Sequence, residues 1–216
     1  MQNLLNAASA VFAEKGYRDA TIAEICERAG ANVAAVNYHF GDKETLYRES
    51  WRHAFLTSIK AYPPDGGVGD DAPPEARLRG QVAALLRRIA DRETMEFFIT
   101  LQELANPTGL LKDLIRDELR PLRVRLGEVV REILGHRAPD REVRFCTLSI
   151  MSQCVNAIVA GLTERQGWED EHGVMAINDI EEYIDHVVRF SLAGISVVGK
   201  GRRKLSSTGT GMVRGD

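Results

Sequence analysis

Apolar residues recur at helical spacing along nearly the whole chain. Leu4, Ala8 and Val11 lie three or four residues apart, and Leu78 and Val82 repeat the pattern in a later segment. Residues spaced in this way share one face of an α-helix, whereas a half-buried strand would alternate. Since 44% of the 216 residues are hydrophobic, the chain can bury a core of its own. We therefore expect an all-α fold.

The charge balance excludes a uniformly basic protein. The sequence holds 28 Lys and Arg residues against 31 Asp and Glu, a formal net charge of -3. Any contact with nucleic acid must therefore come from a local patch. Cys26, Cys146 and Cys154 are an odd, widely spaced set, which favours reduced, buried thiols. The sequence has no secretory signal pattern and no long apolar run, so we expect a cytoplasmic protein that does not contact membranes.

Composition divides the chain into three parts. A stretch rich in Pro and Gly spans residues 62–74, and a stretch rich in Gly, Ser and Thr follows residue 199. We expect a helix-turn-helix domain over 1–46, a helical ligand-binding and dimerisation domain over 47–199, and a basic flexible tail over 200–216. The tail carries five basic residues and one acidic residue, and a solubilising role is favoured over nonspecific contact with DNA.

Helix-capping signals follow one another closely near the N-terminus. Thr21 and Glu24 form a T-x-x-E capping box, in which each side chain can bond to the main-chain N–H of the other. Asn32 and Asp42 are suited to begin the next two helices. Glycines are placed to end the first three helices, at Gly16, Gly30 and Gly41. Two short helices joined by a tight turn form a helix-turn-helix, a unit that is not restricted to DNA-binding proteins.

The residues between these caps form a combination of sequence patterns that is more specific than the caps themselves. The segment 21–47 combines the patterns T-I-x-x-I, A-G, Y-H-F and K-x-x-L-Y. This combination resembles the DNA-binding domain of TetR-family transcriptional regulators, and it covers about the first quarter of the chain. The remainder fits that family's ligand-binding and dimerisation domain in outline. The resemblance implies a homodimeric repressor that binds double-stranded operator DNA and is released by an unknown small-molecule effector.

The resemblance also implies roles for individual residues. In the family the third helix enters the major groove, its outward side chains face base edges, and residues at its end and at the start of the next helix meet the DNA backbone. The implied DNA-binding residues are Thr21, Asn32, Val33, Ala34, Ala35, Asn37, Tyr38, His39 and Lys43. A lysine and free N–H groups at helix N-termini suit phosphate binding.

Base recognition in this helix depends on few polar groups. Val33, Ala34 and Ala35 can contact only thymine methyl groups, whereas Asn37 can pair with adenine N6 and N7. We therefore hypothesise A/T-containing key positions in the operator. Residues 1–55, which we call the head, hold six basic and seven acidic residues, so two weakly binding heads acting together in a dimer, or additional residues upstream, would have to supply affinity.

The larger helical part offers candidates for a ligand pocket and a dimer interface. Large or soft apolar residues with polar neighbours suggest a pocket formed by Met95, Phe98, Gln102, Asn106, Met151 and Cys154. Such a stripe is more often ordinary core, and that interpretation stays open. The family forms its dimer with its last two helices, which here implies an interface formed by Val155, Ile158, Leu162, Ile184, Val188, Leu192 and Ile195. One larger monomeric core is the alternative.

The sequence offers no support for catalysis. It contains no Walker A loop, no G-x-S-x-G and no H-E-x-x-H motif. Glu182 and His186 lie four residues apart, but no second pair of ligands with metal-binding spacing accompanies them. We therefore expect no catalytic residues, no metal and no cofactor. The remaining alternative is an all-α small-molecule-binding protein or enzyme whose helix-turn-helix is not used for DNA.

Overall fold

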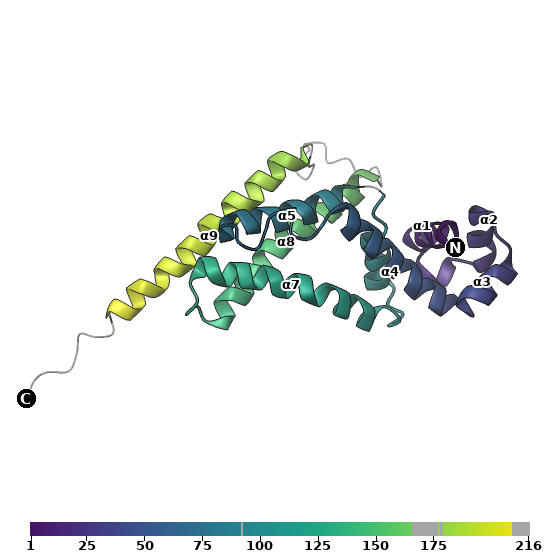
Figure 1. Cartoon of the computed structure of the whole chain (residues 1–216), viewed down its shortest axis with the longest axis horizontal. Helices are drawn as coiled ribbons and strands as arrows, with labels where there is room; N and C mark the ends of the chain where they lie inside the picture. Colours follow the sequence, from purple (N-terminus) through teal and green to yellow (C-terminus); the bar gives the residue numbers. More distant parts are fainter. Residues whose placement is uncertain (92, 166–176, 178, 209–216) are drawn as a thin grey trace, which may run out of the picture. The chain divides into compact units, whose positions relative to one another are not determined.

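The computed structural model describes residues 1–91, 93–165, 177 and 179–208, and for 158–165 and 201–208 it describes the backbone alone. Within these residues every regular element is an α-helix, which confirms the all-α prediction (Figure 1). The helices are α1 (Gln2–Asp19), α2 (Ile22–Ala29), α3 (Val33–Phe40), α4 (Lys43–Ala61), α5 (Pro74–Ala90), α6 (Glu96–Ala105), α7 (Lys112–Leu134), α8 (Asp140–Arg165) and α9 (Ile180–Thr208). No described helix is long and apolar enough to cross a membrane.

The chain forms two compact units, each of which combines two stretches of sequence. The first unit contains Met1–Pro63 and Arg88–Pro121, and the second contains Pro64–Arg87 and Leu122–Asp216. In the first unit α1 packs against α2, α4 and α6, and in the second unit α8 packs against α9. The boundary predicted after residue 46 falls inside α4, which continues without interruption to Ala61.

Aromatic side chains of α1 and α4 form the core of the first unit. The rings of Phe12 and Tyr47 meet edge to face with centroids 4.8 Å apart, and Trp51 stacks on Phe55 at 5.2 Å. All four side chains are buried, and each contributes roughly 1.5–3 kcal/mol by leaving water. Gly16 breaks α1 with a φ of 73°, and the turn brings the centroid of the Tyr17 ring to 6.5 Å from that of Phe12.

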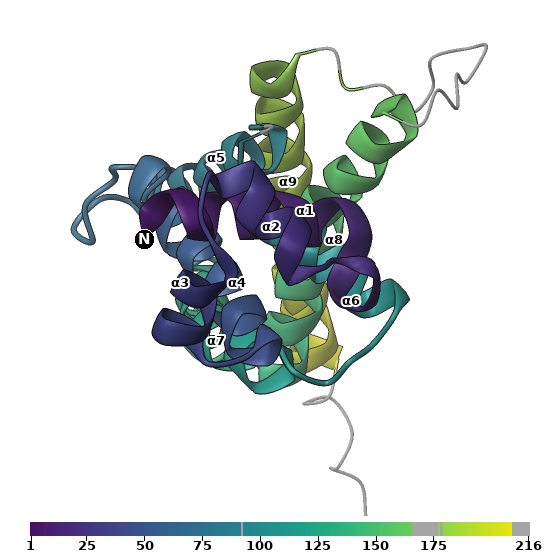
Figure 2. The same cartoon turned by 90° about the vertical axis from the view of Figure 1, so that its right-hand side faces the viewer.

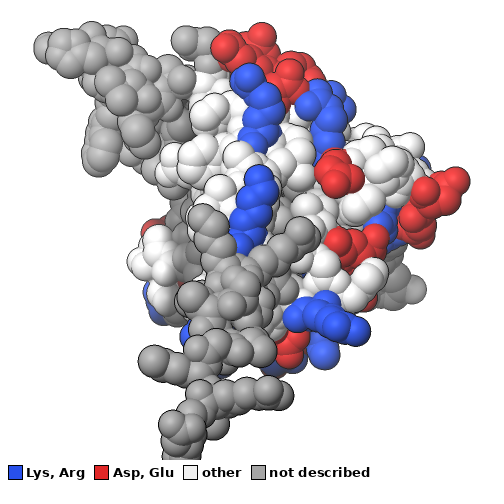
Figure 3. Space-filling model, turned by 90° about the vertical axis from the view of Figure 1, so that its left-hand side faces the viewer, with Lys and Arg blue, Asp and Glu red and all other residues white. Residues whose placement is uncertain are grey.

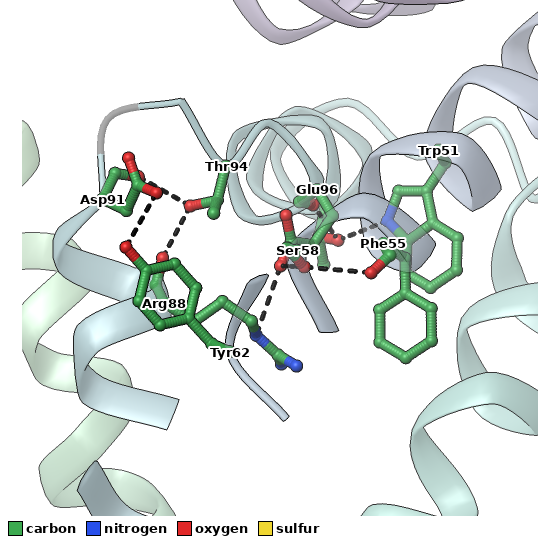
Figure 4. A network of polar contacts seen from close by, with 9 residues as sticks. Trp51, Phe55, Ser58, Tyr62, Arg88, Asp91, Thr94 and Glu96 are labelled. Atoms are coloured by element: carbon green, nitrogen blue, oxygen red, sulfur yellow. Dashed lines mark hydrogen bonds and ion pairs between the residues drawn. The ribbon is translucent and has the colours of Figure 1, made fainter. Parts of the chain in front are cut away.

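A row of side-chain hydrogen bonds joins α4 to α6. The three bonds are Ser58 to Glu96 at 2.6 Å, Trp51 to Thr100 at 2.9 Å, and Tyr47 to Glu103 at 3.2 Å. We call this row the α4–α6 ladder, and two of its rungs appear in Figure 4. On each helix the participating residues are three, four or seven positions apart, so they share one face. Because two residues separate the end of α3 from the start of α4, the ladder ties α6 to the helix that directly follows the helix-turn-helix.

Ion pairs connect α5 to the other helices of the second unit. Arg87 binds Glu181 of α9 through two bonds, at 2.6 and 2.8 Å. Arg79 approaches Asp185 of the same helix to 2.5 Å. These pairs are about half exposed, so each contributes at most about 1 kcal/mol. They orient α5 and α9 more than they stabilise the unit.

The three cysteines differ in burial, and α9 extends past residue 200. Cys26 and Cys154 are buried free thiols as predicted, whereas Cys146 is only partly buried. Helix α9 continues to Thr208, so it runs into the segment 200–216 that the sequence assigns to a flexible tail, and the flexibility of that segment stays a prediction. Extending an existing helix needs no new nucleation, and no proline interrupts the sequence before Thr208. Residues 209–216 lie outside the described part of the chain.

Candidate DNA-binding surface

Side chains and a left-handed glycine shape the turn between α2 and α3. The Thr21 hydroxyl accepts a hydrogen bond from the Glu24 N–H at 3.2 Å, and the Asn32 side chain accepts one from the Ala35 N–H at 2.9 Å. Gly30 adopts φ 63° and ψ 33°, which a residue with a Cβ would resist. The predicted helix-turn-helix is therefore present, and Figure 2 shows α2 and α3 lying next to each other in the first unit.

One half of the predicted capping box is replaced by an ion pair. The Glu24 carboxylate lies 2.7 Å from the ammonium of Lys15 and 3.7 Å from the guanidinium of Arg28. A bond from the Thr21 N–H to Glu24 is not among the hydrogen bonds of the described residues. Glu24 thus fastens α2 to α1, because a full positive charge attracts a carboxylate more strongly than an amide does.

The exposed side of α3 carries the residues that the sequence predicts to face DNA. Val36 is fully buried and holds the helix in place, while the opposite side meets solvent. Val33 is 46% exposed and Tyr38 is 85% exposed. The exposed residues are Val33, Ala34, Asn37, Tyr38 and His39, and Ala35 is half-buried. The rings of Tyr38 and His39 meet in a T-shaped arrangement with centroids 5.0 Å apart.

Helix N-termini beside this surface provide main-chain donors. The N–H groups of Val33 and Ala34 precede the first hydrogen bond within α3, so the helix itself cannot satisfy them. The α2 N-terminus begins beside the exposed Thr21. Main-chain N–H groups at helix ends attract anions, and phosphate oxygens are suitable acceptors.

Lys43 is held in a fixed position at the start of α4. Its ammonium donates to the main-chain oxygen of Arg18 at 3.3 Å and lies 4.6 Å from the centroid of the Tyr17 ring. Burial lowers the pKa of Lys43, and the nearby Asp19 carboxylate opposes that shift. Since the carbonyl engages one of three N–H bonds, the ammonium keeps donors for a further acceptor.

The six cations of the head, Lys43 included, fall into two groups. Three are neutralised by carboxylates, in the pairs Lys15–Glu24, Arg28–Glu14 and Arg52–Glu118. Three donate to main-chain oxygens, in the pairs Arg18–Pro107, Lys43–Arg18 and Arg48–Leu110. The second group keeps its positive charge available for phosphates, and the sequence alone did not single out Arg18 or Arg48. On the face drawn in Figure 3, by contrast, basic and acidic side chains are intermixed.

The predicted pocket residues divide between the two units. Met95, Phe98, Gln102 and Asn106 belong to the first unit, and Met151 and Cys154 belong to the second. Two of the polar residues have structural roles. Gln102 donates to the carbonyl oxygens of Ala13 and Glu14 at 3.4 and 3.3 Å, and the exposed Asn106 caps α6.

Cys154 is fully buried in the second unit. Burial raises the pKa of its thiol to about 12, so the sulfur stays protonated and behaves as a small apolar group.

The predicted dimer-interface residues differ in burial, and their role in a dimer stays a prediction. Ile184, Val188 and Ile195 are at most 6% exposed, so they pack within their own chain. Leu192 is half-buried, Val155 is exposed, and the side chains of Ile158 and Leu162 lie outside the described residues. Other large apolar residues of these helices are exposed, and we call them, with Val155, the α8–α9 apolar face: Phe145, Leu148, Val155, Phe190, Val197 and Val198.

Both parts of the chain are similar to known protein families. Residues 4–49 match the family described as "Bacterial regulatory proteins, tetR family", and residues 74–195 match "HTH-type transcriptional dual regulator CecR, C-terminal domain". The HTH-type transcriptional dual regulator CecR of Shigella flexneri is 50% identical to the chain over 192 residues, which are 82% of this chain and 85% of that protein.

Solved structures show the same fold at low sequence identity. The fatty acid degradation regulator FadR from Bacillus halodurans has a TM-score of 0.67 and 18% identity, covering 89% of this chain and 94% of its own. A TetR-like transcriptional regulator from Rhodococcus sp. RHA1 has a TM-score of 0.66 and 13% identity, covering 90% of this chain and 94% of its own. With its helix-turn-helix and its matched C-terminal domain, the chain belongs to the TetR family of bacterial transcriptional regulators, and its C-terminal domain is of the CecR type.

Proposed function

We propose that the protein is a homodimeric regulator that binds operator DNA through α3 and leaves it when a small-molecule effector binds. The observation that carries this proposal is the exposed side of α3, where Asn37 and Tyr38 stand on a helix fixed by its caps and by the buried Val36. Asn37 would read adenine, and Val33 and Ala34 would contact thymine methyl groups. Phosphates would bind Lys43 and the helix N-termini and so position the reader without specifying sequence.

Dimerisation is supported by the α8–α9 apolar face. Phe145, Leu148, Phe190 and Val197 are all at least 55% exposed, and monomers seldom leave so many large apolar side chains in water on packed neighbouring helices. A two-fold dimer buries the same face on both protomers. Two heads would then bind successive major grooves, roughly 34 Å apart, and add their modest affinities.

The α4–α6 ladder supports control by an effector. Its bonds link α6 directly to Tyr47, Trp51 and Ser58 on α4, the helix that directly follows the recognition helix. An effector that binds one arrangement of α6 more tightly than another would shift the population of α4 positions. We propose that the protein represses transcription and that the effector relieves this repression. The Shigella flexneri relative is named a dual regulator, so activation at some promoters is a second outcome to test.

The proposal is tested by selecting bound duplexes from a randomised library at several salt concentrations. We expect enrichment of an A/T-containing palindrome whose half-sites are about one helical turn apart. Affinity for the selected site should fall steeply with salt, because binding releases counterions from the phosphates. A helical protein that does not use its helix-turn-helix for DNA would enrich no site, and this result would reject the proposal.

A further inference from the structure

A buried arginine lies at the C-terminal end of α5, in the part of that helix that belongs to the first unit. Arg88 is 4% exposed, although the transfer of a guanidinium out of water costs more free energy than that of most other groups. Burial lowers its pKa, and Glu96 opposes that shift. A charge in such a place needs compensation by a partner.

The protein compensates this charge incompletely. Nε of Arg88 lies 3.4 Å from Oε1 of Glu96, but the pair lacks hydrogen-bond geometry and Nε stays without a hydrogen-bond partner. Among the hydrogen bonds of the described residues, none involves the two terminal nitrogens of Arg88. Figure 4 shows these nitrogens pointing away from Glu96 and Ser58. The donor fork of the guanidinium is therefore open to a further acceptor.

Two aromatic rings hold the guanidinium. Its central carbon lies 5.7 Å from the centroid of the Phe55 ring and 5.2 Å from that of Phe97. Ring faces attract a cation but offer no oxygen to its N–H bonds. They orient Arg88 without satisfying it, and the half-buried Phe97 ring is the one of the two that keeps surface for a ligand body.

Glu96 is an imperfect counter-charge. It is 2% exposed, its Oε2 has no hydrogen-bond partner, and its Oε1 accepts from the Ser58 hydroxyl at 2.6 Å. Burial raises the pKa of Glu96 to about 7, against the lowering effects of Ser58 and Arg88 and with a small raising effect of Asp91. Asp91 itself accepts from the Tyr62 hydroxyl at 3.0 Å. Near neutral pH the carboxyl is thus protonated in part of the molecules.

We propose that Arg88 recognises the anionic group of the effector, whose oxygens would bind its terminal nitrogens while the ligand's apolar body packs against Phe97. The inference deepens the proposed function, because it names the effector as an organic anion. A planar guanidinium offers parallel donors that match a carboxylate or a phosphate oxygen pair. Since Glu96 also forms a rung of the α4–α6 ladder, a bound anion would change the charge balance at one end of that ladder.

The test measures binding of three probes with one apolar body to the full-length protein by calorimetry. The probes are 3-phenylpropionate, 3-phenylpropyl phosphate and the neutral 3-phenylpropionamide. We expect at least one anion to bind at least tenfold more tightly than the amide, since a charge-assisted bidentate contact is lost with the amide. Carboxylate and phosphate probes separate the two sources of anionic chemistry. If neither anion binds more tightly than the amide, the proposal is overturned.

Variants assign the effect to Arg88. R88M alone leaves Glu96 without its cation, so the matched pair is E96Q against the double variant R88M/E96Q. E96Q should bind the preferred anion several-fold more tightly than the natural protein, because the competing carboxylate is gone. R88M/E96Q should bind the anion and the neutral amide with equal affinity. R87M, at the exposed neighbouring position, is the control and should leave anion binding unchanged. Equal anion binding by E96Q and R88M/E96Q would exclude Arg88 as the site.

Operator binding without a probe is measured on the same variants. If the natural protein enriches no operator, the proposed function is rejected, whatever affinity the probes show. Normal operator binding together with the loss of anion preference rejects only the assignment of the effector class. The two failures are therefore distinguishable.

Discussion

Tyr47 of α4 donates its hydroxyl hydrogen to the buried carboxylate of Glu103 on α6, at 3.2 Å. The same carboxylate accepts from the Thr108 hydroxyl at 2.8 Å and from the Gly109 N–H at 2.8 Å. One side chain of α6 therefore holds both the start of α4 and the segment that leads to α7. Burial, and next the charge of Glu103, raise the pKa of Tyr47, so its hydroxyl remains a donor throughout the ordinary pH range.

Two variants remove different numbers of these hydrogen bonds and should destabilise the first unit to different extents. Y47F loses one hydrogen bond and should lower the free energy of unfolding by roughly 1 kcal/mol. E103Q should cost more, about 1.5–3 kcal/mol, because an amide cannot accept from all of these donors. Urea unfolding measures both values, with Y38F at the exposed ring as the control. Equal stability of Y47F and the natural protein would show that the bond contributes nothing.

Asn37 and Lys43 should differ in what their loss changes. N37A should relax the preference at one base position by about 1–3 kcal/mol. K43A should weaken binding to all sequences alike and reduce the salt slope by about one phosphate contact. Competition binding to selected and mutated duplexes separates the two effects. If N37A leaves sequence preference unchanged, Asn37 does not read a base.

The buried carboxyl of Glu96 should make stability depend on pH. Its pKa of about 7 exceeds the ordinary value of 4.5, so the folded state binds a proton that the unfolded state has released between these values. The free energy of unfolding should therefore fall by about 2–3 kcal/mol between pH 5 and pH 8. The charged and polar groups facing Glu96 are Arg88 from α5, Ser58 from α4 and Asp91 from the segment between α5 and α6.

E96Q replaces the titratable carboxyl by an amide that does not titrate, and this variant is the comparison for the pH effect. Unfolding by urea at pH 5 and pH 8 should show that the natural protein loses stability relative to E96Q as pH rises. Parallel stabilities of the two proteins over this range would mean that Glu96 keeps an ordinary pKa.

The α8–α9 apolar face should be sensitive to charge. F190E places a carboxylate on a side chain that is 62% exposed in the single chain, and a two-fold interface would suffer the change twice. Loss of two buried phenylalanine side chains corresponds to about 3–6 kcal/mol, or a dimer dissociation constant raised at least a hundredfold. Sedimentation velocity measures this change. L104E, on an equally exposed leucine of α6, should leave the dimer intact, and dissociation by both variants would contradict the assignment.

The sequence predicts contacts between residues close together in the chain, and it does not predict contacts between residues far apart in it. The caps at Thr21, Asn32 and Asp42 were predicted because each bond spans only three residues. The α4–α6 ladder was not predicted, since its partners lie 38 to 56 residues apart and each residue type has many other uses.

The burial of the predicted dimer-interface residues on α9 was not predicted from the sequence for a related reason. That helix is apolar on more than one face, and only its packing on α8 decides which face is internal. Ile184 and Ile195 are internal, whereas Phe190 and Val197 are exposed. Arg88 was overlooked because an arginine in a helix is ordinarily a surface residue, and nothing in its neighbours along the chain reveals its burial.

The unequal burial of the three thiols makes the chain selective toward alkylating reagents. Thiolates react, and burial that raises the pKa of Cys154 to about 12 leaves almost none of that form at neutral pH. Cys26 is 3% exposed, so reagents reach it poorly as well. A maleimide dye should therefore attach first at Cys146, beside Phe145 on α8, and its fluorescence would then report when a second protomer covers that position.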